Sequence, residues 1–212
     1  MANKQTIVIS LGGSLVVPDN IDVEFLKKFK KVLEKYIKNN KFIIIVGGGK
    51  PARNYQKAMQ EFGARNVDQD WIGINITKLN AELVKNIFSK KLQKKIIVSG
   101  GLKPGNSTDY VSVIMAKKYK TKTIINLSNI DYVYEKNPKE FVDAKPFENI
   151  TWKDFQKIVG TKWTPGLNAP FDPKASILAS KSKMKVVIIN GNKLQELEKF
   201  LNNNPFVGTI IQ

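Results

Sequence analysis

Apolar residues occur along the chain in two patterns, and these patterns alternate. Continuous apolar or β-rich runs, as expected of strands, lie at 6–11, 42–46, 96–98, 123–127, 186–189 and 206–211. Between them, apolar residues recur every three or four positions, as on one face of a helix, starting near 22, 70, 108, 152, 173 and 194. Residues 139–150 show neither pattern and are expected to form a loop.

This alternation predicts an α/β fold. A run that is apolar throughout, such as 42–46, is typical of a strand covered on both sides. We therefore expect a three-layer αβα sandwich around a mostly parallel twisted sheet. The 212 residues contain no repeat and no linker-like stretch, so a single domain spanning 1–212 is predicted.

Three of the predicted strands end in glycine-rich turns, at 12–14, 47–49 and 100–105. The third turn lies in the segment 96–109 (IIVSGGLKPGNSTD), which has the pattern of a buried strand, a tight loop and a helix that opens on hydroxyl caps. Turns of bare backbone before helices present N–H groups, which suit anions. Each turn alone is compatible with an ordinary connection, but the three together favour a site for a chain of phosphates.

Arg53 adds to this interpretation. It is one of only two arginines in the chain and follows the triple glycine, where Pro51 suits the start of a helix. A guanidinium can bind a phosphate through two parallel hydrogen bonds, although an ordinary surface arginine is the alternative. The segment is not a Walker A loop, because Ile44 stands where that motif needs its first glycine. The residues thus predict phosphoryl transfer on a scaffold other than the P-loop.

Other polar candidates lie in two further segments. Asp70 begins a long helical pattern and either caps that helix or accepts a hydrogen bond from a ligand hydroxyl. The segment 128–138 (SNIDYVYEKNP) follows a strand end and offers an amide, a carboxylate and aromatic rings as a platform for a base and phosphates; core packing of its tyrosines is the alternative. The segment 162–173 is rich in Pro, Gly and aromatic residues, unlike a simple linker.

Composition excludes several kinds of chemistry. The chain has no cysteine and no histidine, which excludes disulfides, catalysis by these side chains and metal sites built from them. The net charge of +17 favours anionic substrates, and the dispersed lysines favour a solvated surface over a dedicated nucleic-acid face. No apolar run approaches the roughly 20 residues of a membrane span. Without a visible signal peptide, we expect a cytoplasmic protein without membrane contact.

The ordered motifs resemble those of the amino acid kinase family, and particularly its UMP kinases of the archaeal type. The motifs are the segments 12–14 (GGS), 47–53 (GGGKPAR), 100–109 (GGLKPGNSTD) and 128–138, and the resemblance runs from about residue 6 to residue 209. It implies the amino acid kinase fold and transfer of the γ-phosphoryl group of Mg-ATP to UMP, giving UDP and ADP in pyrimidine nucleotide biosynthesis. It also implies a homo-oligomer, usually a hexamer, with ATP and Mg²⁺ as cofactors.

The resemblance further implies roles for single residues. It puts the N-terminal part of the domain mainly on the UMP side and roughly 120–212 mainly on the ATP side. The catalytic candidates are Arg53, Asp109 and Asp172. ATP is expected at Gly13, Ser14, Gly49, Arg53, Ser128, Asn129, Tyr134 and Asn137. UMP is expected at Gly48, Asp70, Leu102, Lys103, Pro104, Gly105, Asn106, Ser107 and Thr108. No protein ligand of a metal is predicted.

Three positions depart from the usual pattern of the family. Ser10 stands where many members have lysine, Tyr132 replaces a glycine and Asn137 replaces an aspartate. The last two changes bear on the choice between ATP and GTP, with ATP as the default. Either the charge missing at Ser10 comes from elsewhere, with Lys50, Lys136 and Lys174 as the candidates, or the rate is low.

Two other functions stay open at this point. The first is another kinase of the same fold that acts on an acyl, carbamoyl or phosphate acceptor. The absence of histidine argues against isopentenyl phosphate kinase, a relative that uses a histidine on its substrate. The second is a non-catalytic anion- or nucleic-acid-binding member of the family, which Ser10 and the high positive charge would suit.

Overall fold

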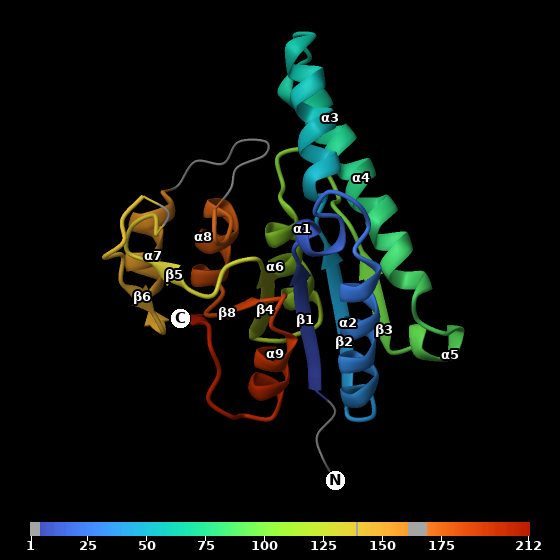
Figure 1. Cartoon of the computed structure of the whole chain (residues 1–212), viewed down its shortest axis with the longest axis vertical. Helices are drawn as coiled ribbons and strands as arrows, with labels where there is room; N and C mark the ends of the chain where they lie inside the picture. The colour runs from blue at the N-terminus through green and yellow to red at the C-terminus, as the bar shows by residue number, and fades with distance from the viewer. Residues whose placement is uncertain (1–4, 139, 161–168) are drawn as a thin grey trace.

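The computed structural model describes residues 5–138, 140–160 and 169–212. Figure 1 shows a central sheet with helices on both faces and a second, two-stranded sheet beside it. The predicted three-layer α/β architecture is confirmed. Most of the segment 162–173 lies outside the described residues. None of the described helices is both long enough and apolar enough to cross a membrane.

The central sheet brings the ends of the first strands to one edge. Its seven strands have the order β3-β2-β1-β4-β8-β9-β7, and every neighbouring pair is parallel except β8 with β9. In register, Leu11 pairs with Val46 and Ile45 with Ser99, so the turns after β1, β2 and β3 leave from the same edge. The strands are β1 (Gln5–Leu11), β2 (Asn40–Val46), β3 (Ile96–Ser99), β4 (Thr123–Ser128), β7 (Asn149–Ile150), β8 (Lys185–Asn190) and β9 (Thr209–Ile211).

Alternate side chains of each strand enter two different cores, as the two-residue period of a strand requires. On one face, Ile7 and Ile9 of β1 pack in a cluster with α2 (Val23–Tyr36), α4 (Asn66–Asn86) and α9 (Leu194–Leu201). On the other face, Val8 packs in a cluster with α6 (Thr108–Lys118), α7 (Trp152–Val159) and α8 (Pro173–Lys181). Both cores hold the strand ends rigidly beneath the glycine turns.

The helices next to the glycine turns begin where the sequence provides caps. Ser107 caps α6 by accepting a hydrogen bond from the Tyr110 N–H at 3.1 Å, and Asp172 caps α8 by accepting from the Ala175 N–H at 2.6 Å. Helix α1 (Gly13–Val16) and helix α3 (Gly49–Glu61) begin within the glycine turns themselves, and α5 (Lys90–Gln93) precedes β3. The far end of α3 and the start of α4 project from the body of the molecule (Figure 1).

Three sequence predictions need correction. Helix α4 begins at Asn66, before Asp70, because its first turn (NVDQ) is mostly polar and carries little hydrophobic signal. The segment 139–150 is not all loop: β6 (Pro146–Phe147) pairs with β5 (Val133–Tyr134), and β7 joins the central sheet, but two-residue strands are too short for a periodic pattern. Strand β9 starts later than 206, because Phe206 packs against Phe200 of α9 with ring centroids 5.2 Å apart.

Candidate active site

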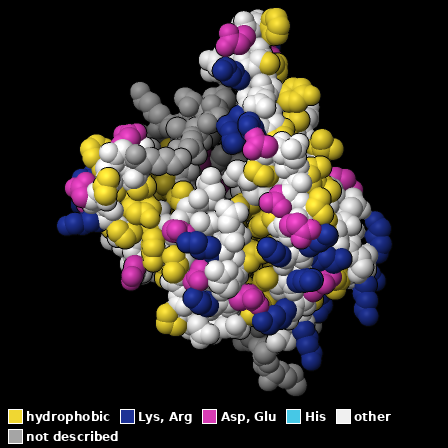
Figure 2. Space-filling model, in the orientation of Figure 1, with side chains coloured by type: hydrophobic (Ala, Val, Ile, Leu, Met, Phe, Trp, Pro, Cys, Tyr) yellow, Lys and Arg dark blue, Asp and Glu magenta, His cyan; other side chains and the backbone are white. Residues whose placement is uncertain are grey.

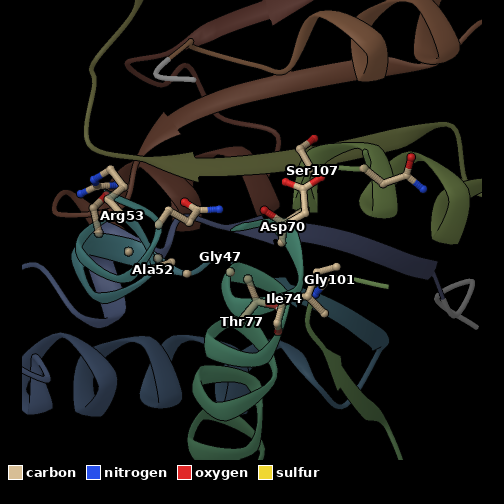
Figure 3. A pocket seen from close by; sticks show the side chains of 16 residues that line it. Gly47, Ala52, Arg53, Asp70, Ile74, Thr77, Gly101 and Ser107 are labelled. Carbon is tan, nitrogen blue, oxygen red and sulfur yellow. Dashed lines mark hydrogen bonds between the residues drawn. The ribbon is translucent and has the colours of Figure 1, made fainter. Parts of the chain in front are cut away.

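One pocket gathers residues from all three glycine turns. It has a volume of about 250 Å³ and lies at the edge where β1, β2 and β3 end (Figure 3). The prediction that these turns meet at a common edge is confirmed. The lining residues are Gly13, Ser14, Gly47, Gly48, Gly49, Ala52, Arg53, Gln56, Asp70, Gly73, Ile74, Thr77, Gly101, Asn106, Ser107 and Thr108.

The first two turns touch each other through bare backbone. A Cβ atom on Gly13 would lie 2.1 Å from the nitrogen of Gly49, and a Cβ on Gly49 would lie 2.5 Å from the oxygen of Gly13. Gly49 also has a φ of +68°, in the left-handed region. Only glycine therefore allows this contact, which brings the peptide groups of the two turns to one side of the pocket.

Helix α3 adds positive potential to the pocket. Its N-terminus lies within the triple glycine, at Gly49, and helix N-termini attract anions through their free N–H groups. Arg53, the fifth residue of α3, is exposed and lines the pocket, as Figure 3 shows. Within the described residues its guanidinium forms no ion pair. Its charge is thus available to an anionic ligand.

Asp70 joins the third turn to helix α4. Its side chain is buried, with 8% of the residue exposed, and its Oδ2 atom accepts a hydrogen bond from the Gly105 N–H at 2.7 Å. Of the two roles left open for Asp70, helix capping is excluded, because α4 already begins at Asn66. Asp70 lines the pocket with its second carboxylate oxygen still able to accept from a ligand hydroxyl.

The predicted UMP segment 102–108 is only partly in the pocket. Asn106, Ser107 and Thr108 line it, whereas Leu102 and Lys103 are exposed and do not. Pro104 and Gly105 are half-buried outside the lining. The Nδ2 atom of Asn106 is buried and has no hydrogen-bond partner among the described residues. An unpaired buried amide in a pocket can donate to a ligand or to water.

Ser10, Asp109 and Asp172 form a cluster beside the pocket. The Ser10 hydroxyl donates to Asp109 Oδ1 at 2.8 Å, and the Asp172 N–H donates to Asp109 Oδ2 at 3.0 Å. Asp172 caps α8 with Oδ1, while its Oδ2 is buried without a hydrogen-bond partner in the described part of the chain. These contacts join the first strand, α6 and α8 around two carboxyl groups.

The two carboxyl groups are hard to ionise. Burial raises the pKa of Asp109 to about 6, and the nearby charge of Asp172 adds to the effect, while the hydrogen bond from Ser10 opposes it. Burial also raises the pKa of Asp172, against the hydrogen bond from the Ala175 N–H. Two acids with raised pKa values next to a phosphate-sized pocket are typical of a functional site.

The residues predicted for adenosine do not line this pocket. Ser128 lies at the end of β4, next to β1, and Tyr134 lies in β5 with its ring 6.4 Å from that of Tyr132, edge to face. Asn129 and Asn137 are exposed, and the Asn137 amide donates to Glu140 at 2.6 Å. Only Ser128 of these four residues ends a strand beside the glycine turns.

The three lysines considered as substitutes for the charge at Ser10 have different surroundings. Lys50 bonds to Asp19, and Lys136 bonds to Asp143 at 2.8 Å. Lys174 follows Asp172 in α8, and its Nζ donates to the Gly105 oxygen at 3.2 Å. Lys174 is therefore the one of the three that contacts the segment 102–108.

Sequence reasoning missed several lining residues. Gln56, Ile74 and Thr77 were not predicted, and all three occupy helical positions that carry no motif of their own. Spacing offered one signal: positions 70, 73, 74 and 77 recur on one face of a helix, so the site prediction for Asp70 could have been extended along α4.

Comparisons with known proteins agree with this geometry. The chain matches the amino acid kinase family over residues 5–99 and 74–190. It is 34% identical over 224 residues to the uridylate kinase of Methanococcus aeolicus, covering 97% of this chain and 98% of that protein. It is 33% identical over 220 residues to the uridylate kinase of Methanobrevibacter smithii, covering 96% and 97%.

Solved structures agree as well. The crystal structure of uridylate kinase from Archaeoglobus fulgidus superimposes with a TM-score of 0.82 at 31% identity, covering 97% of this chain and 99% of that one. The fold is also that of UMP kinase from Ureaplasma parvum, with a TM-score of 0.80 at 22% identity and 99% of each chain covered. The chain belongs to the amino acid kinase family.

Proposed function

We propose that this protein is a UMP kinase, which transfers the γ-phosphoryl group of ATP to UMP and releases UDP and ADP. The observation that carries the proposal is the meeting of three glycine turns and Arg53 at one pocket, in a chain whose relatives over nearly its full length are uridylate kinases. In this reaction an oxygen of the UMP phosphate attacks the γ-phosphorus, and the bond from that phosphorus to ADP breaks.

The pocket suits a reaction that consists mainly of charge stabilisation. Phosphoryl transfer needs little covalent help from the protein, and donors aimed at the transferring group supply most of the acceleration. Here the N–H groups of Gly48 and Gly49 donate no hydrogen bond within the described residues, and they lie at the N-terminus of α3. Arg53 adds a full positive charge that can bind two phosphate oxygens at once.

Each substrate is assigned to one side of the site. UMP lies against Gly48, Asp70 and the segment 102–108, of which Asn106, Ser107 and Thr108 line the pocket, so the N-terminal part of the domain is mainly the acceptor side. The ATP phosphates lie against Gly13, Ser14 and Gly49, and adenosine extends toward Ser128, Asn129, Tyr134 and Asn137, so residues 120–212 are mainly the donor side. The contact of Gly13 with Gly49 supports a shared site for the ATP phosphates, because it brings these two turns together.

Asp109 and Lys174 have proposed roles at the reacting groups. Asp109 organises them through its contacts with Ser10 and the backbone of Asp172. Lys174 supplies the charge that Ser10 lacks, because it contacts the segment 102–108 from α8. Asp172 holds the start of α8, and thereby Lys174, in place.

Magnesium would enter with ATP rather than through a protein cage. Among the described residues, no cluster of three acidic side chains could hold a metal, and the Asp109–Asp172 pair is the acidic pair next to the pocket. Mg²⁺ keeps several waters and binds phosphate oxygens with at most one or two carboxylates, which fits these residues, with Asp172 as a candidate protein ligand. The ion would neutralise phosphate charge.

A panel of acceptors tests the proposal. The purified chain is supplied with Mg-ATP and, in separate reactions, with UMP, dUMP, CMP and acetylglutamate, and ADP formation is measured. We expect UMP to be the best acceptor and UDP to be the product. Activity on UMP no better than on acetylglutamate would favour another kinase of this fold. Tight RNA binding with steep salt dependence and no ATP turnover would favour a non-catalytic member.

We also propose that the projecting part of α3 and α4 joins copies of the chain into a homo-oligomer, a hexamer by resemblance. Large apolar side chains are exposed there, as Figure 2 shows along the projecting helices, and exposed apolar patches are typical of interfaces. Light scattering, which measures the molar mass in solution, tests this. Phe62→Ser should lower the molar mass, whereas Val142→Ser, at a fully exposed apolar residue elsewhere, should not. The residues are Tyr55, Phe62, Val67 and Trp71.

A further inference from the structure

Two buried polar residues of helix α4, Thr77 and Asn80, contact the glycine turns but belong to neither substrate assignment. Thr77 and Asn80 are 8% and 6% exposed and lie three positions apart, so they share one side of the helix. Asp70, two turns earlier, lies on the same side as Thr77. Each of these residues makes a hydrogen bond to a different part of the glycine turns.

Thr77 connects α4 to the start of the third turn. Its hydroxyl donates to the Ile74 oxygen at 2.7 Å within the helix, which leaves an oxygen lone pair that accepts from the Gly101 N–H at 2.6 Å. A Cβ atom on Gly100 would lie 2.6 Å from this hydroxyl oxygen, so the turn approaches the helix as closely as glycine permits. Figure 3 shows Thr77 beside Gly101 at the pocket. The segment 102–108 therefore begins at a fixed point.

Asn80 connects α4 to the triple glycine. Its Nδ2 atom donates to the Gly47 oxygen at 2.9 Å and to the Gly48 oxygen at 3.2 Å. In a trans peptide the C=O and the following N–H point in opposite directions, and the described chain has no cis peptide bond. By holding these two carbonyls, Asn80 turns the N–H groups of Gly48 and Gly49 away from α4. These are the two N–H groups that donate to no described residue.

We propose that Thr77 and Asn80 are positioning residues for the reaction: Thr77 sets the acceptor loop for UMP, and Asn80 orients the two phosphate-facing peptides of the triple glycine. One rigid helix thus fixes two turns relative to each other without touching the reacting atoms. This inference rests on the proposed UMP kinase activity. It assigns Thr77 an effect on the KM for UMP and Asn80 an effect on kcat, a separation that a merely structural role would not produce.

The test for Thr77 compares two variants. Thr77→Val keeps the shape and removes the hydroxyl, whereas Thr77→Ser keeps the hydroxyl. We expect Thr77→Val to raise the KM for UMP on the order of tenfold, as loss of a buried hydrogen bond does, with the KM for ATP unchanged. Thr77→Ser should restore the wild-type KM for UMP. If Thr77→Val does not fold, Thr77→Ala takes its place in the comparison.

The test for Asn80 has a matched control on the same helix. Asn80→Leu removes the donor at similar size, while Asn86→Leu changes an exposed asparagine whose Nδ2 donates to the backbone and side chain of Glu82. We expect Asn80→Leu to lower kcat on the order of tenfold or more, because misaligned N–H groups no longer face the transferring phosphoryl group. Asn86→Leu should keep the wild-type kcat.

The outcomes separate this inference from the proposed function. A wild-type enzyme that does not phosphorylate UMP defeats the proposed function. A wild-type enzyme that is active, with Thr77→Val equal to Thr77→Ser or with both substrates' KM values shifted alike, overturns the role of Thr77. A melting temperature that falls in Asn80→Leu while kcat stays unchanged overturns the role of Asn80 and leaves it a structural residue.

Discussion

The two sides of the proposed active site are built in different ways. At the phosphates, glycine backbone lies directly against glycine backbone, and on the acceptor side buried side chains of α4 hold the turns. On the donor side, the candidates follow β4 through a polar segment with two-residue strands, and Asn137 bonds to its exposed neighbour Glu140.

This difference indicates where the reaction tolerates change. Turns in backbone contact cannot accept a side chain without moving, whereas exposed side chains can be exchanged with little effect on the fold. Two of the three departures from the family pattern, Tyr132 and Asn137, fall on the donor side. We therefore expect substitutions on the acceptor side and at the phosphates to have larger effects than those on the donor side.

The largest expected effect is that of Arg53→Ala. It removes the charge available to the phosphates, and we expect kcat/KM to fall on the order of 10²–10⁴-fold. The chain contains a matched control, because its only other arginine, Arg65, is bound to Asp68 at 2.9 Å on the surface. Arg65→Ala should keep kcat/KM near the wild-type value. Equal kinetics for the two variants would remove Arg53 from the catalytic machinery.

Next in size is Gly13→Ala, which tests the backbone contact. The added Cβ would lie 2.1 Å from the Gly49 nitrogen, so the turns must separate, and we expect a loss of about 3 kcal/mol in unfolding free energy. Gly63→Ala is the comparison: its φ is +71°, but nothing lies within 4 Å of the added atom, so its cost is about 1 kcal/mol. Denaturant unfolding measures both. Similar losses would show that the two turns can separate freely.

Asp70→Asn probes the acceptor side alone. The amide loses the negative charge that accepts from Gly105 and from the ligand, and we expect the KM for UMP to rise about tenfold with little change in the KM for ATP. Initial rates with each substrate varied in turn provide the measurement. A rise confined to the KM for ATP would instead place Asp70 on the donor side.

The pH dependence follows from Asp109, whose pKa of about 6 lies above the usual value near 3.9. The folded state therefore binds the proton more tightly, so this residue makes stability fall as pH rises from about 4 to about 6, with no further change above. If ionised Asp109 organises the reaction, kcat/KM drops below about pH 6. Ser10→Ala removes a hydrogen bond that favours ionisation, so the pH–rate curve should move to higher pH. An unmoved curve would assign the titration to another group.

The sequence predicted two kinds of site residue: glycines in the turns, and an arginine in a chain that contains only two. Gly13 and Gly49 are visible because no other residue permits their contact, and Arg53 because arginine is so rare in this chain. Thr77 and Asn80 were not predictable in the same way. They are polar positions in a long helix, and their meaning depends on which way α4 faces the sheet, which tertiary packing decides.

The fold shows the same limit. Long periodic segments such as β2 and α2 were predicted because burial imposes a repeated pattern on many residues. The pairing of β5 with β6 involves two residues in each strand, and the partner of Asn137 is three residues away in a polar segment. Such local contacts leave no pattern in the sequence, so the donor side was the less predictable half of the site.

The smallest expected effect is that of Asn137→Ala, which tests how far the donor side tolerates change. The side chain is exposed and bonds to Glu140, so its loss removes a surface hydrogen bond that contributes little to stability. We expect the KM for ATP to change less than about threefold and the KM for UMP not at all. Tyr134→Ala serves as the comparison, because its half-buried ring packs against Tyr132 and should matter more for the nucleotide base. A tenfold loss of ATP affinity in Asn137→Ala would show that Asn137 leaves Glu140 to bind the nucleotide. Substitutions on the donor side would then be as harmful as those on the acceptor side.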